Sequence, residues 1–214
     1  MRMSERALFV NLGSGPHAQD GWQNLDKSPS LTLSRIKALR SVLHRVGLVA
    51  SSSMVDWSPN VIRADLRKPL PYGDGEVSAI YSSHALEHLY FADAEELLKE
   101  CLRVLRKGGV LRLALPDFHD IASEALSTEA LDGLELQERL NAHPLERPRG
   151  RRRLQSILSA SNHRWQPTRK LVESMLLMAG FRAVTFPTFR EGQLPDLSEI
   201  ENRETGMFVE TSKP

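Results

Sequence analysis

A histidine–glutamate–histidine group lies in the segment SSHALEHL, directly after a predicted strand at 77–82. His84, Glu87 and His88 are spaced i, i+3 and i+4, so in a helix beginning there they would share one face. A glutamate beside an imidazole fixes its tautomer and raises its basicity, which suits removal of a proton from a hydroxyl. We favour base catalysis by His84 or His88. The alternative is that Glu87 and His88 only cap and orient the loop.

Other polar residues could complete this reactive group. Asp117 directly follows a predicted strand at 110–115, where it could bind the hydroxyl groups of a substrate, act as a base, or simply cap the next helix. His119, His143 or His163 could join the first three residues around Mg²⁺, which would ease loss of a hydroxyl proton. Magnesium prefers oxygen ligands, and two imidazoles with one carboxylate suit it badly. The sequence therefore favours a base without a metal.

Glycines and acids follow three earlier apolar runs. Gly13 and Gly15 turn the chain after the first run, at 7–12, and glycine there lets the backbone approach a ligand closely and tolerates positive φ. Asp26 ends the second run, where a carboxylate can accept hydrogen bonds from both hydroxyls of a ribose. Asp65 follows the third, where it can accept from an adenine amino group. Each feature alone is typical of a turn or cap, but their order favours a nucleoside-like ligand.

Apolar runs alternate with amphipathic segments along the chain. The predicted strands are 7–12, 22–26, 60–64, 77–82, 110–115, 181–186 and 207–211, and the predicted helices are 31–46, 93–107 and 167–179. Asp93 is predicted to cap the second helix and Gly108–Gly109 to end it. This alternation predicts an α/β fold, with a mostly parallel sheet and helices on both faces. Such sheets bind ligands at the carboxyl ends of their strands.

These segments resemble the small class I S-adenosylmethionine-dependent methyltransferases. The resemblance is carried by NLGSG, NLD, ADLRKPLPYGDGEVSAIYSSHALEHL and LLKECLRVLRKGGVLRLALPD, and it resumes at NHRW, LLMAGF and GMFVETSKP. The closest likeness is to the compact group associated with polysaccharide and other glycan synthesis. It implies one Rossmann-like domain over 1–214 with a seven-stranded sheet. It also implies S-adenosylmethionine as cofactor, leaving as S-adenosylhomocysteine.

The resemblance assigns cofactor contacts residue by residue. Gly13 and Gly15 would border the methionine part, Asp26 the ribose, and Asp65 with Leu66 the adenine. The implied cofactor-binding set is Asn11, Gly13, Gly15, Asp26, Asp65, Leu66, Ser82 and Ser83. Two departures from the family pattern stand out. Asp26 follows Gly15 by only eleven positions, which leaves room for a compact loop but not a first helix, and Ser78 replaces the aspartate that usually opens the fourth strand.

Residues 118–166 are too many for an ordinary connection after the fifth strand, so we predict a substrate-capping insertion there. It contains the basic run at 146–153 and ends near His163, Arg164 and Trp165. We expect Trp165 to stack on a sugar ring while His163 and Arg164 supply polar contacts. An equal alternative is that Trp165 packs to anchor the lid.

Composition narrows the function classes. The formal net charge of +1 provides no overall field toward nucleic acid or an anionic membrane. No apolar run reaches the length of a membrane span or matches a signal peptide, so a cytoplasmic protein is expected. The single cysteine, Cys101, excludes an internal disulfide and suits a buried, inert thiol. Enzymes of this size and fold often pair, which suggests a homodimer.

The leading hypothesis is therefore O-methylation of a sugar or small glycan hydroxyl, by in-line methyl transfer with base assistance. RNA methylation is an alternative because of the arginines in 146–153, although their charge is local and few aromatic residues accompany them. A non-catalytic protein that binds S-adenosylmethionine is another alternative. A nicotinamide dehydrogenase fits the sheet, but the third glycine of the dinucleotide fingerprint is absent.

Overall fold

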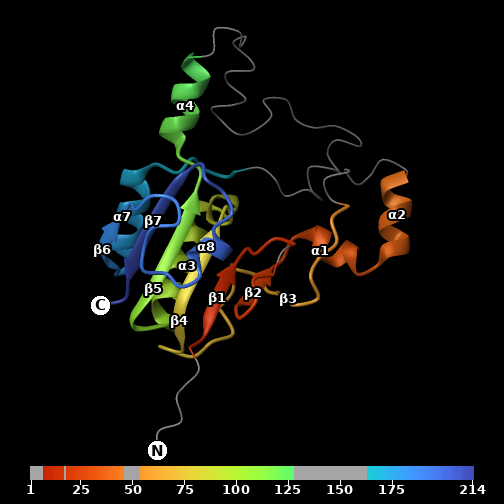
Figure 1. Cartoon of the computed structure of the whole chain (residues 1–214), viewed down its shortest axis with the longest axis horizontal. Coiled ribbons are helices and arrows are strands. Elements are labelled where there is room, and N and C mark those ends of the chain that lie inside the picture. The colour runs from red at the N-terminus through yellow and green to blue at the C-terminus, as the bar shows by residue number, and fades with distance from the viewer. Residues whose placement is uncertain (1–6, 17, 46–53, 128–162) are drawn as a thin grey trace, which may run out of the picture.

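The computed structural model of the chain describes residues 7–16, 18–45, 54–127 and 163–214. Seven strands form one sheet in the order β3-β2-β1-β4-β5-β7-β6, with β3 and β6 at its edges (Figure 1). The strands are β1 (Phe9–Leu12), β2 (Gln23–Asp26), β3 (Val61–Arg63), β4 (Val77–Ser83), β5 (Leu105–Leu115), β6 (Arg182–Thr185) and β7 (Met207–Ser212). Neighbours from β3 to β5 are parallel, whereas β7 runs antiparallel to both β5 and β6. This confirms the predicted mostly parallel, Rossmann-like sheet.

Helices cover the sheet and extend from one of its edges. The helical elements in the described ranges are α1 (Pro29–Ser34), α2 (Lys37–Arg45), the 3₁₀ turn η2 (Leu86–His88), α3 (Phe91–Val104), α4 (Phe118–Ser127), α7 (Arg169–Ala179) and α8 (Leu197–Ile200). Thr168 caps α7 by accepting from the Leu171 amide at 3.3 Å, and Gly180 ends that helix at a φ of 105°. Within these ranges no helix has both the length and the apolar character needed to cross a membrane.

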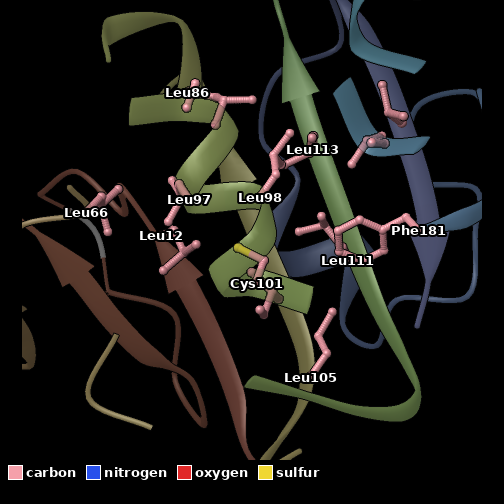
Figure 2. Close-up of a cluster of buried hydrophobic side chains, with 14 of the residues drawn as sticks. Leu12, Leu66, Leu86, Leu97, Leu98, Cys101, Leu105, Leu111, Leu113 and Phe181 are labelled. Carbon is pink, nitrogen blue, oxygen red and sulfur yellow. The ribbon is translucent and has the colours of Figure 1, made fainter. Parts of the chain in front are cut away.

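Alternation along β5 divides the core between the two faces of the sheet. Leu111, Leu113 and Leu115 belong to the larger cluster, which contains the buried side chains of α3 and α7. Figure 2 shows this cluster, with Cys101 of α3 among the leucines. Cys101 is buried as expected, and its burial raises the pKa of the thiol, so it stays protonated and inert. Ala114 belongs to a second cluster, which also contains buried residues of α8.

Two helix boundaries differ from the predictions. The predicted helix at 93–107 ends at Val104, because Leu105 already pairs with Val77 in the sheet and is fully buried. Gly108, at a φ of 71°, therefore lies within β5 rather than at a helix end. Tyr90 occupies the N-cap without a side-chain hydrogen bond, and Asp93 lies in the first turn, so the predicted Asp93 cap is wrong.

The predicted helix at 31–46 is two helices, α1 and α2, separated at Arg35 and Ile36. The Ser34 hydroxyl donates to the Leu31 carbonyl at 2.8 Å, and the Arg35 side chain donates to the Val61 carbonyl beyond the sheet edge at 3.2 Å. Side-chain bonds to the backbone of this kind compete with continued helix.

Candidate functional site

A cavity of about 740 Å³ opens at the carboxyl ends of four neighbouring strands. Its walls include residues 13–16 after β1, 26–29 after β2, 65–67 after β3 and 83–85 at the end of β4. Strand order changes direction between β1 and β4, so this is the switch point where open α/β sheets bind ligands. Eleven of the site residues predicted from the sequence line it: Asn11, Gly13, Gly15, Asp26, Asp65, Leu66, Ser83, His84, His88, His163 and Arg164.

The glycine loop after β1 is pinned to the end of β2. The Gly13 amide donates to the Leu25 carbonyl at 2.8 Å, and the Gly15 amide donates to the Asp26 carboxylate at 3.0 Å. Both glycines have positive φ, 70° and 65°. No helix occurs among the described residues between β1 and β2, as the short spacing from Gly15 to Asp26 predicts. The loop is thus a compact, backbone-lined wall that a ligand can approach closely.

Asp26 is held rigidly at the end of β2. Its side chain is 6% exposed, and its two oxygens accept from the amides of Gly15 and Ser28, at 3.0 and 2.6 Å. Amide donors of this kind stabilise the ionised carboxylate. Each carboxylate oxygen can accept a further hydrogen bond, so Asp26 can receive a diol from the cavity side.

Asp65 is surrounded by cations at the end of β3. Arg67 donates to both of its carboxylate oxygens at 2.9 Å, and Lys27 donates at 2.5 Å. The pKa of Asp65 is held far below its usual range, chiefly by the hydrogen bond from Arg67 and to a lesser extent by that from Lys27. Asp65 is therefore ionised at any working pH, and it remains an acceptor at the β3 end of the cavity.

The reactive group is built around a buried glutamate. Glu87 is fully buried in η2, and its Oε1 lies 3.3 Å from Nδ1 of His84 and 3.8 Å from Nε2 of His163. The His88 and His163 rings meet edge to face, with centroids 4.9 Å apart. His84 precedes η2 with a φ of 48°, so the longer helix considered from the spacing does not form. Three imidazoles nevertheless converge on one carboxylate.

The segment that begins at His163 packs directly on this group. The Arg164 amide donates to the Glu87 carbonyl at 2.7 Å, which sets His163 beside the Glu87 carboxylate. The Arg164 guanidinium lies over the Tyr90 ring, 4.4 Å from its centroid. Residues 128–162, with the basic run and His143, lie outside the described residues, so the lid itself stays a prediction.

Four predicted site residues are not among those that line the cavity. Ser82 is buried and donates to the Leu12 carbonyl at 3.0 Å, while Glu87 lies behind the histidines. Asp117 is buried and accepts from the His119 amide at 3.0 Å at the start of α4, which agrees with its capping alternative. Trp165 packs against Phe91 and the larger core cluster, which agrees with its packing alternative.

Sequence reasoning missed the wall contributed by Tyr81 and by residues 200–203. Arg112, fully buried in β5, pairs with fully buried Glu201 through hydrogen bonds of 3.0 and 2.9 Å, and this pair fixes the segment beside the cavity. The sequence signal for this pair was the charged Arg112 inside the apolar strand LRLAL. Burial raises the pKa of Tyr81 to about 12, so its phenol is a donor near neutral pH and not a base.

We expect Gly13→Ala to destabilise the protein more than Gly15→Ala. Both residues have positive φ, which costs a non-glycine residue about 1–2 kcal/mol. A Cβ on Gly13 would also lie 2.4 Å from the Ala85 Cβ, whereas one on Gly15 meets nothing within 4 Å. Overpacking of this kind adds about 1–3 kcal/mol. Urea unfolding of the ligand-free variants measures the difference, and equal losses would contradict the Gly13–Ala85 contact.

Comparisons with known proteins agree with this geometry. The family described as "Methyltransferase domain" matches residues 33–113, from the end of α1 into β5. A chain from a complex of the Haloferax volcanii Trm112 methyltransferase activator with a protein described as a methyltransferase aligns at a TM-score of 0.51. It is 17% identical, over 100% of this chain and 85% of that chain.

A second solved structure is the S-adenosylmethionine-dependent methyltransferase of Mesorhizobium loti, which is 21% identical. The alignment covers 98% of this chain and 92% of the Mesorhizobium loti chain, at a TM-score of 0.48. No curated protein sequence matches the chain. The likeness to the Haloferax chain supports the sheet order found here, and the family match covers the segment that carries Asp65 and the histidine group.

Proposed function

We propose that this chain, an S-adenosylmethionine-dependent methyltransferase with the class I fold, methylates a hydroxyl of a sugar or small glycan. The observation that carries the proposal is the convergence of His84, His88 and His163 on buried Glu87 at the cavity wall. An alcohol is a weak nucleophile near neutral pH and needs such a proton acceptor, whereas an amine that is already deprotonated does not.

The sheet order separates two ends of the cavity. Asp65 follows β3 and His84 follows β4, and three strand spacings of about 4.8 Å each lie between these strands. Asp65, Asp26 and the glycines therefore follow one another along the edge, as adenine, ribose and methionine do along the cofactor. The acceptor is expected beyond them, at the histidines.

The acceptor end is polar and carries one exposed aromatic ring. Tyr90, Asp93 and Arg164 line it together with the histidines, and Tyr90 is 61% exposed. Hydroxyl-rich acceptors need both donors and acceptors, and an aromatic edge can contact their C–H faces. These features support a sugar over a purely apolar acceptor.

Methyl transfer requires the acceptor oxygen, methyl carbon and sulfur to lie in line. The oxygen lone pair forms the new O–C bond, the C–S bonding pair returns to sulfur, and the hydroxyl proton passes to an imidazole. Glu87 faces Nδ1 of His84 and favours the proton on that nitrogen, which leaves Nε2 as the proton acceptor. The products are a methyl ether and S-adenosylhomocysteine.

Transfer of a labelled methyl group tests the proposal. The purified chain is incubated with methyl-labelled S-adenosylmethionine and separate panels of mono- and disaccharides, small amines and RNA oligonucleotides. We expect alkali-stable label on a saccharide, with little dependence on moderate salt. Label on amines alone would contradict the proposal, and salt-sensitive label on RNA would favour the nucleic-acid alternative.

A further inference from the structure

We propose that Glu87, His88 and His163 form a binding site for a divalent transition-metal ion at the wall of the cofactor cavity. One ligand atom from each of the three side chains can be chosen so that all lie within 4.8 Å of one another. The part of this proposal that concerns metal binding stands apart from the proposed function. Only the role of the metal in catalysis depends on that function.

The Glu87 carboxyl group is the strongest indication of a cation site. The residue is 0% exposed, and among the described residues neither of its oxygens receives a hydrogen bond. Buried carboxyl groups in native structures are hydrogen-bonded, paired with a cation or coordinated to a metal, because an unsatisfied one is costly. Nδ1 of His84 and Nε2 of His163 lie 3.3 and 3.8 Å from Glu87 Oε1, and the second distance is beyond hydrogen-bond length.

The separation between Glu87 and His163 suits a shared ion better than a direct bond. Ligand atoms around a tetrahedral ion, each at about 2.1 Å, lie about 3.4 Å from one another. The 3.8 Å between Glu87 Oε1 and His163 Nε2 is close to this value. The backbone bond from the Arg164 amide to the Glu87 carbonyl holds the two ligand-bearing segments side by side.

The ligand set determines which metals fit. Two imidazoles and one carboxylate suit Zn²⁺, Co²⁺, Mn²⁺ or Fe²⁺ and leave coordination positions open, whereas Mg²⁺ favours oxygen. His88 and His163 line the cavity, so the open positions would face a bound acceptor. A hydroxyl bound there would lose its proton more easily, and His84 beside Glu87 could receive it. This proposal differs from the sequence prediction of a base without a metal, and the metal titration decides between them.

Cobalt titration tests the site without cofactor or acceptor. The full chain, freed of affinity tag and treated with chelator, is titrated with Co²⁺ while its visible d–d absorption is followed. We expect saturation at one equivalent with the spectrum of imidazole ligation, displacement by Zn²⁺, and no displacement by excess Mg²⁺. An absence of stoichiometric Co²⁺ and Zn²⁺ binding would overturn the proposal.

Variants locate the ion. We expect Glu87→Gln and His163→Gln each to weaken Co²⁺ binding by at least about 100-fold, because each removes a ligand. His119→Gln is the matched control, since the His119 side chain is 84% exposed and lies outside the cluster. Binding of S-adenosylmethionine checks that each variant is folded. Undiminished Co²⁺ binding in both folded ligand variants would contradict the site, and if neither folds, the wild-type titration decides.

Discussion

Asp26→Ala is expected to weaken S-adenosylmethionine binding by at least about 100-fold. The Asp26 carboxyl group is buried and oriented by the amides of Gly15 and Ser28. Hydrogen bonds to a charged group contribute about 1.5–3 kcal/mol each, and the ribose diol can form two of them. A 100-fold loss corresponds to about 2.7 kcal/mol, slightly less than the sum of about 3–6 kcal/mol for two such bonds. Isothermal titration calorimetry measures it.

Two further variants show whether the loss of affinity comes from the ribose contact or from disruption of the glycine loop that Asp26 holds. Asp26→Asn keeps one acceptor oxygen for the loop or the ligand, so we expect a smaller loss than for Asp26→Ala. Asp74→Ala removes an 82% exposed carboxylate far along the chain and should leave affinity unchanged. If Asp26→Ala binds S-adenosylmethionine within threefold of the wild type while its melting temperature is preserved, Asp26 does not hold the ribose.

The part of the cavity lined by the glycine loop, Asp26 and Asp65 was predictable because its sequence signals are local. Each of Gly13, Asp26 and Asp65 directly follows a short apolar strand, and parallel neighbours bring the ends of such strands to one edge. Hydrophobic alternation located the strands to within a few residues. Nothing beyond strand order and the residue types was needed to place these groups in one cavity wall.

The rest of the site depends on contacts between distant segments. His163 comes seventy-five positions after His88, and only the folded chain brings their rings into contact. The wall at 200–203 is held by the Arg112–Glu201 pair, which joins β5 to a segment near the C-terminus. Periodicity carries no information on such pairings, so the sequence could include His163 only as one of several candidates.

Hydrophobic periodicity also misplaced helix ends where the apolar pattern continues past the end of a helix. The stripe at 31–46 runs through the break between α1 and α2, and the one at 93–107 continues into β5. Leu105 was expected to be buried on the inner face of the helix, and it is buried in the strand instead. Pairing with Val77 in the sheet places Leu105 in a strand, and hydrophobic periodicity does not reveal such a tertiary contact.

His84→Asn is expected to lower kcat by about 10²–10⁴-fold with little change in affinity for S-adenosylmethionine. This is the range contributed by a positioned general base. Asparagine is the appropriate replacement because His84 has a φ of 48°, a conformation that asparagine tolerates better than alanine does. The imidazole is removed while the turn between β4 and η2 is kept, so a loss of activity can be attributed to the proton acceptor.

The kinetic pattern distinguishes a base from a residue that merely shapes the cavity. Loss of an interaction formed only in the transition state lowers kcat and kcat/KM together, whereas loss of uniform binding raises KM alone. Steady-state rates with the best saccharide acceptor, with cofactor affinity from calorimetry, separate the two cases. His119→Asn, at an exposed position outside the cavity, should behave as the wild type. A kcat within threefold of the wild type for His84→Asn would show that His84 is not the proton acceptor.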